Sequence, residues 1–247
     1  MPNPRETEII SFYNKESESY SRKRYLGAPK SYTQYFFQNR LAITLRLLAK
    51  YVSGKKDMKL IDIACADGVM TRAVSQRFPE NFSALVGTDI SIDMIETAKR
   101  ITTDPKISFF VKDNQVFPNA GMEGSFDIAL GLGYLAPAIY EGEMAFLKQY
   151  IKKDGIYMTS LAAHDSIHAR LKLRDAEYRK DYVSYAKYEI MLRKHFHIIK
   201  KIPNGLFVPK LWAIPVLGRT LQPLADIVFR HIIPGLFHEM IYVLRLK

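Results

Sequence analysis

The sequence lacks the features typical of secreted, zinc-bound or membrane-spanning chains. Cys65 is the single cysteine among 247 residues, which excludes an internal disulfide and any zinc site built from several thiolates. No uninterrupted run of about 18 apolar residues occurs, so a transmembrane helix is not expected. Residues 1–8 are polar and lack the apolar centre of a signal peptide. We therefore expect a cytoplasmic protein in a reducing compartment.

Two further patterns are absent. No Gly-x-Gly-x-x-Gly follows any apolar segment, which argues against NAD or FAD as a cofactor. The six histidines show no metal-ligand spacing, so we expect no metal. The composition that remains, 48% hydrophobic and 25% charged, is ordinary for a globular protein. The length suits one large α/β domain.

Positive charge is in excess and unevenly distributed. The net charge is +11, and residues 165–247 carry 15 Lys and Arg against 7 Asp and Glu, whereas residues 1–164 carry 21 against 18. This imbalance is compatible with an anionic partner, namely a phosphate-bearing substrate, an anionic membrane or a nucleic acid. A solvated basic surface without a specific partner is the alternative.

Short apolar runs alternate with helical patterns, which predicts βαβ units and a parallel sheet. The predicted strands are residues 59–63, 83–88, 107–111, 126–130, 155–161, 197–202 and 240–246. Residues 35–51 predict a long amphipathic helix. We divide the single domain, 1–247, into an N-terminal helical cap (1–56), a cofactor-binding core (57–163) and an acceptor-side region (164–247). The last contains a helical insertion, 203–238, interrupted by prolines.

The first predicted strand runs into a turn of small residues. Asp62 ends the strand, and Ala64, Ala66 and Gly68 allow a close approach of the backbone to a ligand. Ligands of open parallel sheets bind beyond the carboxyl ends of the strands. Asp62 and Asp67 would repel a phosphate group. They suit a ligand with a cationic amine and no phosphate, and S-adenosylmethionine has both properties.

Polar residues also follow the next two strands. Asp89 lies 27 positions after Asp62, where a carboxylate can accept both ribose hydroxyls. Ile90 beside it can pack on the adenine face. Asp113 and Asn114, past the third strand, can contact the adenine amino group.

With these motifs in order, residues 59–161 resemble the core of class I S-adenosylmethionine-dependent methyltransferases. The resemblance implies a Rossmann-like, doubly wound seven-stranded sheet of order 3-2-1-4-5-7-6 with the last strand antiparallel. Gly131 and Tyr134 follow the fourth strand, where cofactor and acceptor meet in the family. The cofactor-binding residues implied are Asp62, Ala64, Cys65, Ala66, Gly68, Asp89, Ile90, Asp113, Asn114 and Gly131.

The chain departs from the family pattern at two positions. Ala64 and Ala66 stand where the family has glycines. If either position required a positive φ, alanine would cost about 1 kcal/mol or more. Weak cofactor binding, or a non-catalytic domain of the same fold, is therefore an alternative.

Candidates on the acceptor side are weaker. His164, just past the fifth strand, is either a general base or a surface histidine. Tyr13 and Tyr20 form either a lid over the cofactor or plain helix packing. Tyr134 and Trp212 are the other candidate substrate contacts. We interpret Cys65 as a small buried residue rather than a nucleophile.

The insertion 203–238 bears on the choice of acceptor. It mixes apolar residues with Lys210, Arg219 and Arg230, so it either lies in a membrane interface or packs entirely on the domain. We expect methyl transfer to a small-molecule or lipid-linked acceptor with an anionic group, in the cytoplasm or at the inner face of a membrane. An RNA methyltransferase is the alternative, but no RNA-binding module or Pro-Pro-aromatic motif supports nucleic acid as a partner. The oligomeric state is not predicted.

Overall fold

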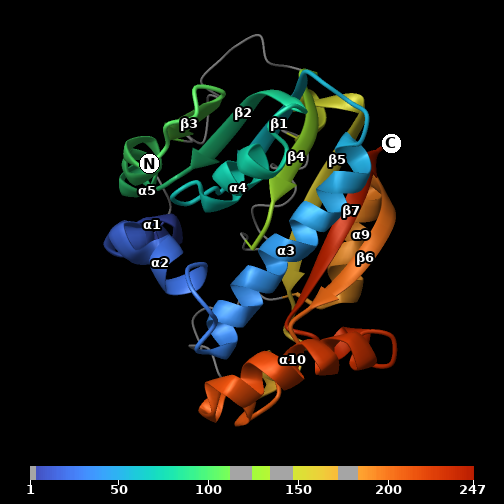
Figure 1. Ribbon diagram of the computed structural model, residues 1–247. Coiled ribbons are helices and arrows are strands. Elements are labelled where there is room, and N and C mark those ends of the chain that lie inside the picture. The colour runs from blue at the N-terminus through green and yellow to red at the C-terminus, as the bar shows by residue number, and fades with distance from the viewer. Residues whose placement is uncertain (1–3, 112–123, 134–146, 172–182) are drawn as a thin grey trace.

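A computed structural model describes residues 4–111, 124–133, 147–171 and 183–247, which form a seven-stranded sheet with helices on both faces (Figure 1). The strand order is β3-β2-β1-β4-β5-β7-β6, as predicted. Strand β7 runs antiparallel to both β5 and β6, whereas the other neighbours are parallel. The strands are β1 (Met58–Ile63), β2 (Phe82–Asp89), β3 (Ile107–Val111), β4 (Phe126–Gly131), β5 (Ile151–Ala162), β6 (Phe196–Asn204) and β7 (Glu239–Leu246).

The helices follow the predicted alternation. Those described are α1 (Pro4–Glu16), η1 (Ser17–Ser19), α2 (Tyr20–Arg24), α3 (Tyr32–Val52), α4 (Val69–Arg77), α5 (Ile92–Arg100), α7 (Ile167–Arg170), α9 (Tyr185–His195), η3 (Leu211–Ala213), α10 (Pro215–Phe229) and η4 (Pro234–Leu236). Among the described residues, no helix has the length and apolarity needed to cross a bilayer.

The strands are apolar on both sides because each face of the sheet is covered. Leu60 of β1 belongs to a cluster with Leu47 and Leu48 of α3, whereas its neighbour Ile61 belongs to a second cluster with Tyr188 of α9. Successive strand residues point to opposite faces, so a continuous apolar run fills both layers. This explains why runs without alternation form these strands.

Two boundaries differ from the prediction by three or more residues. Helix α3 begins at Tyr32 rather than at residue 35, because the side chain of Ser31 accepts a hydrogen bond from the backbone N–H of Gln34 and caps the helix. Strand β5 begins at Ile151 rather than at residue 155. Residues 152–154, near the start of the strand, are charged and exposed, but Ile151 before them pairs with Phe126 of β4. Hydrophobicity alone does not detect a strand extended by backbone pairing.

The carboxyl ends of β1, β2, β4 and β5 share one edge of the sheet, toward the bottom of Figure 1. Helices α1 and α2 lie beside this edge on one side. The predicted insertion between β6 and β7 forms η3, α10 and η4, which lie below it. The edge is thus flanked by both regions that the sequence assigned to the cap and the acceptor side.

Candidate active site

The turn after β1 has an unusual backbone. Ala64, Ala66 and Gly68 have φ angles of 57°, 50° and 76°. The amide of Cys65 bonds to Thr88 of β2 at 3.0 Å, which holds the turn against the neighbouring strand. The left-handed region costs alanine roughly 1–2 kcal/mol per residue. The chain therefore keeps the glycine-type conformation at two alanines and carries the strain.

Two buried carboxylates support this turn. The oxygens of Asp89 accept hydrogen bonds from the amides of Ala66 and Ser91, each at 2.9 Å. Asp62 accepts from the Thr71 hydroxyl at 2.6 Å. Burial raises the pKa of Asp62 to about 7; the bond from Thr71 opposes this rise, and the charge of Asp89 adds to it. A cation placed beside Asp62 would lower this pKa again.

Asp67 in the same turn connects it to the N-terminal cap. Its Oδ2 atom accepts hydrogen bonds from the hydroxyl and the backbone N–H of Ser21 in α2, the latter at 3.1 Å. Its Oδ1 atom is buried and has no hydrogen-bond partner among the described residues. At the end of β2, the Ser91 hydroxyl bonds to Asn14 of α1 at 2.6 Å. The two N-terminal helices therefore contact both turns of the predicted cofactor site.

The cap also carries a cluster of aromatic rings. The ring centroids of Tyr13 and Tyr20 lie 6.3 Å apart, Tyr20 and Tyr25 are equally close, and Tyr25 lies 5.6 Å from Phe37. The guanidinium of Arg24 lies 4.3 Å from the centroid of Tyr20. The structure thus brings Tyr13 and Tyr20 together beside the turn of Asp67. Their contact with a bound ligand stays a prediction.

Cys65, Ile90 and Gly131 lie at the ends of β1, β2 and β4. Burial, with the nearby carboxylates, raises the pKa of the Cys65 thiol well above its usual value, which agrees with a packing role. Gly131 is buried and accepts a hydrogen bond from Thr159 at 3.0 Å. The predicted contacts Asp113, Asn114 and Tyr134 lie outside the described residues.

Two acceptor-side candidates have identified contacts. The His164 side chain is 53% exposed, and its Nδ1 atom contacts the carboxylate of Asp165. Trp212 donates from Nε1 to Gln222 at 3.2 Å and packs closely under Gly218. Its indole therefore holds α10 against η3. Catalysis by His164 and substrate contact by Trp212 stay predictions.

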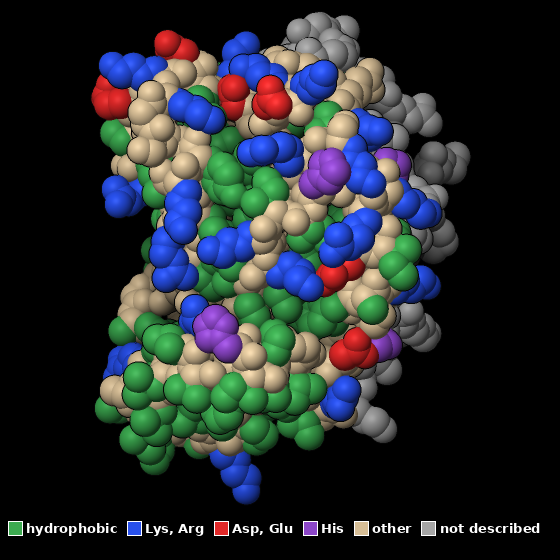
Figure 2. All heavy atoms as spheres, turned by 90° about the vertical axis from the view of Figure 1, so that its right-hand side faces the viewer, with side chains coloured by type: hydrophobic (Ala, Val, Ile, Leu, Met, Phe, Trp, Pro, Cys, Tyr) green, Lys and Arg blue, Asp and Glu red, His purple; other side chains and the backbone are tan. Residues whose placement is uncertain are grey.

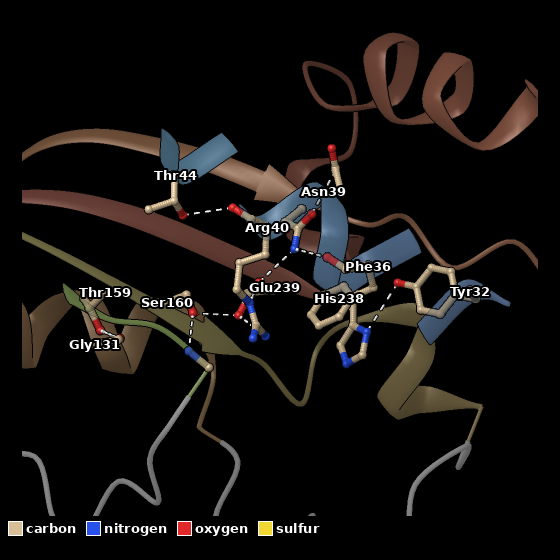
Figure 3. A network of polar contacts seen from close by, with 12 residues as sticks. Tyr32, Phe36, Asn39, Arg40, Thr44, Gly131, Thr159, Ser160, His238 and Glu239 are labelled. Carbon is tan, nitrogen blue, oxygen red and sulfur yellow. Dashed lines mark hydrogen bonds and ion pairs between the residues drawn. The ribbon is translucent and has the colours of Figure 1, made fainter. Parts of the chain in front are cut away.

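A buried polar network, which sequence reasoning missed, lies beside the turn after β4 (Figure 3). Arg40 of α3 donates from Nε to Glu239 of β7 at 2.9 Å and from Nη2 at 2.8 Å. Glu239 also accepts from Ser160 at 2.6 Å and from Asn204 at 2.8 Å. Ser160 in turn accepts from the amide of Gly133 at 2.8 Å. The signal available in the sequence was a charged residue, Arg40, on the apolar side of a predicted helix.

Gly133 shows why this turn is close to the network. It has a φ of 73°, and a Cβ atom there would lie 2.3 Å from Nη1 of Arg40. Glycine is therefore required by both backbone conformation and space. The Arg40 network therefore holds the segment that follows β4, where the family resemblance predicts that cofactor and acceptor meet.

Comparison with known proteins agrees with this geometry. Residues 60–155 match the model of a methyltransferase domain. A juvenile hormone acid O-methyltransferase from Bombyx mori is 33% identical over 88 residues, which are 36% of this chain and 31% of that protein. The match thus spans about a third of the length of this relative.

Solved structures extend the likeness to the whole fold. Geranyl diphosphate C-methyltransferase from Streptomyces coelicolor A3(2) is 12% identical, with a TM-score of 0.64 over 100% of both chains. An S-adenosylmethionine-dependent methyltransferase from Mesorhizobium loti is 16% identical, with a TM-score of 0.56 over 82% of this chain and 96% of that one. Residues 60–155 thus match a methyltransferase domain, and the fold of the chain is that of the class I, Rossmann-like S-adenosylmethionine-dependent methyltransferases.

Proposed function

We propose that this chain transfers the methyl group of S-adenosylmethionine to a small-molecule or lipid-linked acceptor that bears an anionic group. The observation that carries the proposal is the set of three buried carboxylates, Asp62, Asp67 and Asp89, around one left-handed backbone turn. Such a turn disfavours a phosphate and favours a cationic nucleoside.

The residues present fit the cofactor. The buried Oδ1 of Asp67 has no partner in the described part of the chain, so it can accept a hydrogen bond from an ammonium group. The raised pKa of Asp62 indicates a site that a positive charge would stabilise. A carboxylate oxygen has more than one acceptor position, so Asp89 can hold the turn and accept ribose hydroxyls together.

When bound, S-adenosylmethionine supplies a methyl group activated by a positively charged sulfur. The chain's own task is to orient the reactants and keep water out. Asp62, Asp67 and Asp89 would orient the cofactor, and the tyrosines of α1 and α2 would cover it. An acceptor whose attacking atom is already anionic, such as a carboxylate oxygen, needs no general base. A hydroxyl acceptor would need one, and His164 is then the candidate.

The anionic acceptor is supported by two observations. The last third of the chain has an excess of Lys and Arg. The Bombyx mori relative, by its name, acts on an acid, and the Streptomyces structure contains geranyl diphosphate. We therefore propose a carboxylate or phosphate on the acceptor.

The first test is calorimetric titration with S-adenosylhomocysteine. Asp89→Asn keeps the shape of the side chain but removes its charge, so we expect binding about 10–100-fold weaker, on the scale of one hydrogen bond to a charged group. Asp93→Ala, on the exposed face of α5, is the matched control and should bind like the wild type. Thermal unfolding would confirm that both variants fold.

The second test identifies the class of methyl acceptor. Methyl-labelled S-adenosylmethionine would be incubated with carboxylic acids, prenyl diphosphates, matched neutral alcohols and RNA. Label in the acids or diphosphates supports the proposal, whereas label only in RNA contradicts it. No binding of S-adenosylhomocysteine would instead support a non-catalytic protein of this fold.

A further inference from the structure

Helix α10 has its polarity reversed relative to an ordinary surface helix. Its buried side consists of Gly218, Gln222 and Asp226, spaced four residues apart. The Asp226 carboxylate accepts from the Tyr35 hydroxyl at 2.8 Å and from the amide of Leu206 at 2.9 Å. A surface helix normally buries its apolar side and exposes its polar one. Here the hydrogen bonds that hold the helix leave its apolar side outward.

The exposed apolar residues form one continuous surface. From Val216 to Val228 of α10 they are between 44% and 58% exposed, and they are Val216, Leu217, Leu221, Leu224, Ile227 and Val228. Ile214, Phe229 and Ile232 extend the set at the two ends. These nine, named here the α10 surface, are nine of the 17 large hydrophobic side chains exposed among the described residues. Figure 2 shows hydrophobic side chains gathered at the lower end of the molecule, where α10 lies in Figure 1.

The exposed Lys, Arg, Asp and Glu side chains of residues 203–238 are all positively charged. Residues 203–238 contain Lys210, Arg219 and Arg230, whereas Asp226 is their one acidic residue and is 2% exposed. Within the described part of the chain, neither Lys210 nor Arg219 forms an ion pair. The α10 surface therefore presents apolar side chains beside uncompensated cations.

We propose that the α10 surface docks the protein on an anionic membrane. An interfacial helix buries an apolar side at the boundary between headgroups and acyl chains, while cationic side chains contact anionic lipid heads. A contiguous apolar surface of this extent marks an interaction site. A second copy of the chain fits less well, because a two-fold contact would place the same cationic residues of both copies at one interface.

Helix α3 connects the α10 surface to the buried network of the candidate active site. Tyr35 and Asn39 of α3 both contact Asp226 of α10, and the residue after Asn39 is Arg40 of the buried network. Docking through α10 would thus place the acceptor side of the sheet edge near the membrane. The docking proposal itself does not depend on methyl transfer, since it rests on the exposed residues of α10 alone.

The test is co-flotation with vesicles. The full chain would be mixed with vesicles of equal parts phosphatidylcholine and phosphatidylglycerol, and separately with phosphatidylcholine alone, at ionic strengths of about 0.1 M and about 1 M. We expect flotation with the anionic vesicles at low salt, and a marked loss with neutral vesicles or at high salt. Absence of flotation with anionic vesicles at low salt overturns the proposal.

Variants identify the surface. Leu221→Glu and Leu224→Glu together should lower the partition coefficient at least about tenfold for each replaced side chain. Ile190→Glu changes an even more exposed apolar residue, on α9, and is the matched control, expected to float like the wild type. Because all three side chains are exposed, unfolding temperatures should stay close to that of the wild type. Equal flotation of the double variant and the wild type contradicts the proposal.

Light scattering distinguishes the two alternative partners of the α10 surface, a second copy of the chain and another protein. A dimer that the double variant dissociates, without flotation of the wild type, would assign the α10 surface to a second copy. A monomer that does not float would leave a protein partner as its occupant. Both outcomes overturn membrane docking, and neither alters the calorimetric test of cofactor binding.

Discussion

Arg40 of α3 and Glu239 of β7 form a buried, two-point ion pair that joins a helix to the central sheet. The side chain of Arg40 is 7% exposed and that of Glu239 is not exposed. Asn204 and Ser160 complete the bonding of the carboxylate, and the Arg40 guanidinium lies 4.8 Å from the ring centroids of both Phe36 and Phe37. The pair therefore has the partners that a buried charge requires.

Breaking this pair should be strongly destabilising. Glu239→Leu leaves the Arg40 charge buried without its partner, so we expect a loss of about 3–5 kcal/mol in the free energy of unfolding. Arg40→Met should have a similar cost. The double variant should lose less than the sum of the two, because no buried charge remains. Urea unfolding of the three variants measures this, and additive losses would contradict a direct coupling.

Asp62 predicts a dependence of stability on pH. In the unfolded chain its pKa is near the usual value of 3.8, whereas in the folded protein burial raises it to about 7. Between these values the folded state binds more protons, so stability falls as pH rises from about 4 to about 7. Asp62→Asn removes this titration. Its advantage over the wild type should grow across that range, by at most about 1.4 kcal/mol per pKa unit.

The measurement is urea unfolding of the ligand-free protein at several pH values. Asp93→Asn, on the exposed face of α5, is the matched control, and its difference from the wild type should stay nearly constant. A constant difference between Asp62→Asn and the wild type would show that Asp62 is ionised throughout. A bound ammonium group favours the carboxylate, and S-adenosylhomocysteine carries one, so its affinity should rise with pH through about 7 in the wild type only.

The strained turn predicts two stabilising substitutions. Ala64 and Ala66 adopt left-handed conformations, which glycine adopts without steric cost. Ala64→Gly and Ala66→Gly should each raise the free energy of unfolding, by up to about 1 kcal/mol, since the greater freedom of the unfolded chain offsets part of the gain. Ala73→Gly in helix α4 is the control and should lower stability by about 1 kcal/mol. Thermal unfolding distinguishes these signs, and a loss at both turn positions would contradict the strain.

The core of the fold could be predicted because its signals are local. Strand ends followed by acidic residues, such as Asp62 and Asp89, showed the order of the βαβ units, and the sheet order followed from the family resemblance. The sequence predicts strain at Ala64 and Ala66 only if these positions require a positive φ. It does not show that they do, since alanine usually avoids positive φ. Side-chain identity alone does not reveal a backbone held by long-range contacts such as Cys65 to Thr88.

The remaining site contacts depend on pairs far apart in the chain. Arg40 and Glu239 are separated by 199 positions, and Ser21 and Asp67 by 46. No periodicity joins such residues, so the sequence does not show which of them pair. The outward apolar side of α10 was equally hidden, because hydrophobic periodicity locates an apolar stripe without showing what covers it.

Ser21 should control how firmly the cap closes on the cofactor turn. Its hydroxyl and amide both bond to Asp67, so Ser21→Ala removes one of the two bonds between α2 and the turn. If the closed cap is the state that binds ligand, a smaller closed population weakens apparent affinity in proportion. We expect S-adenosylhomocysteine to bind about 3–10-fold more weakly, on the scale of one net hydrogen bond, with a faster dissociation rate.

Ser19→Ala provides the comparison within the same cap. The Ser19 hydroxyl bonds to the carbonyl of Glu16 at 3.3 Å, and no contact with the turn is described for it. Stopped-flow dissociation should therefore be faster for Ser21→Ala than for Ser19→Ala, while both unfold at temperatures close to the wild type. Equal rates in the two variants would mean that the bond to Asp67 positions α2 without affecting the closed state, because only a bond that breaks on opening changes the dissociation barrier.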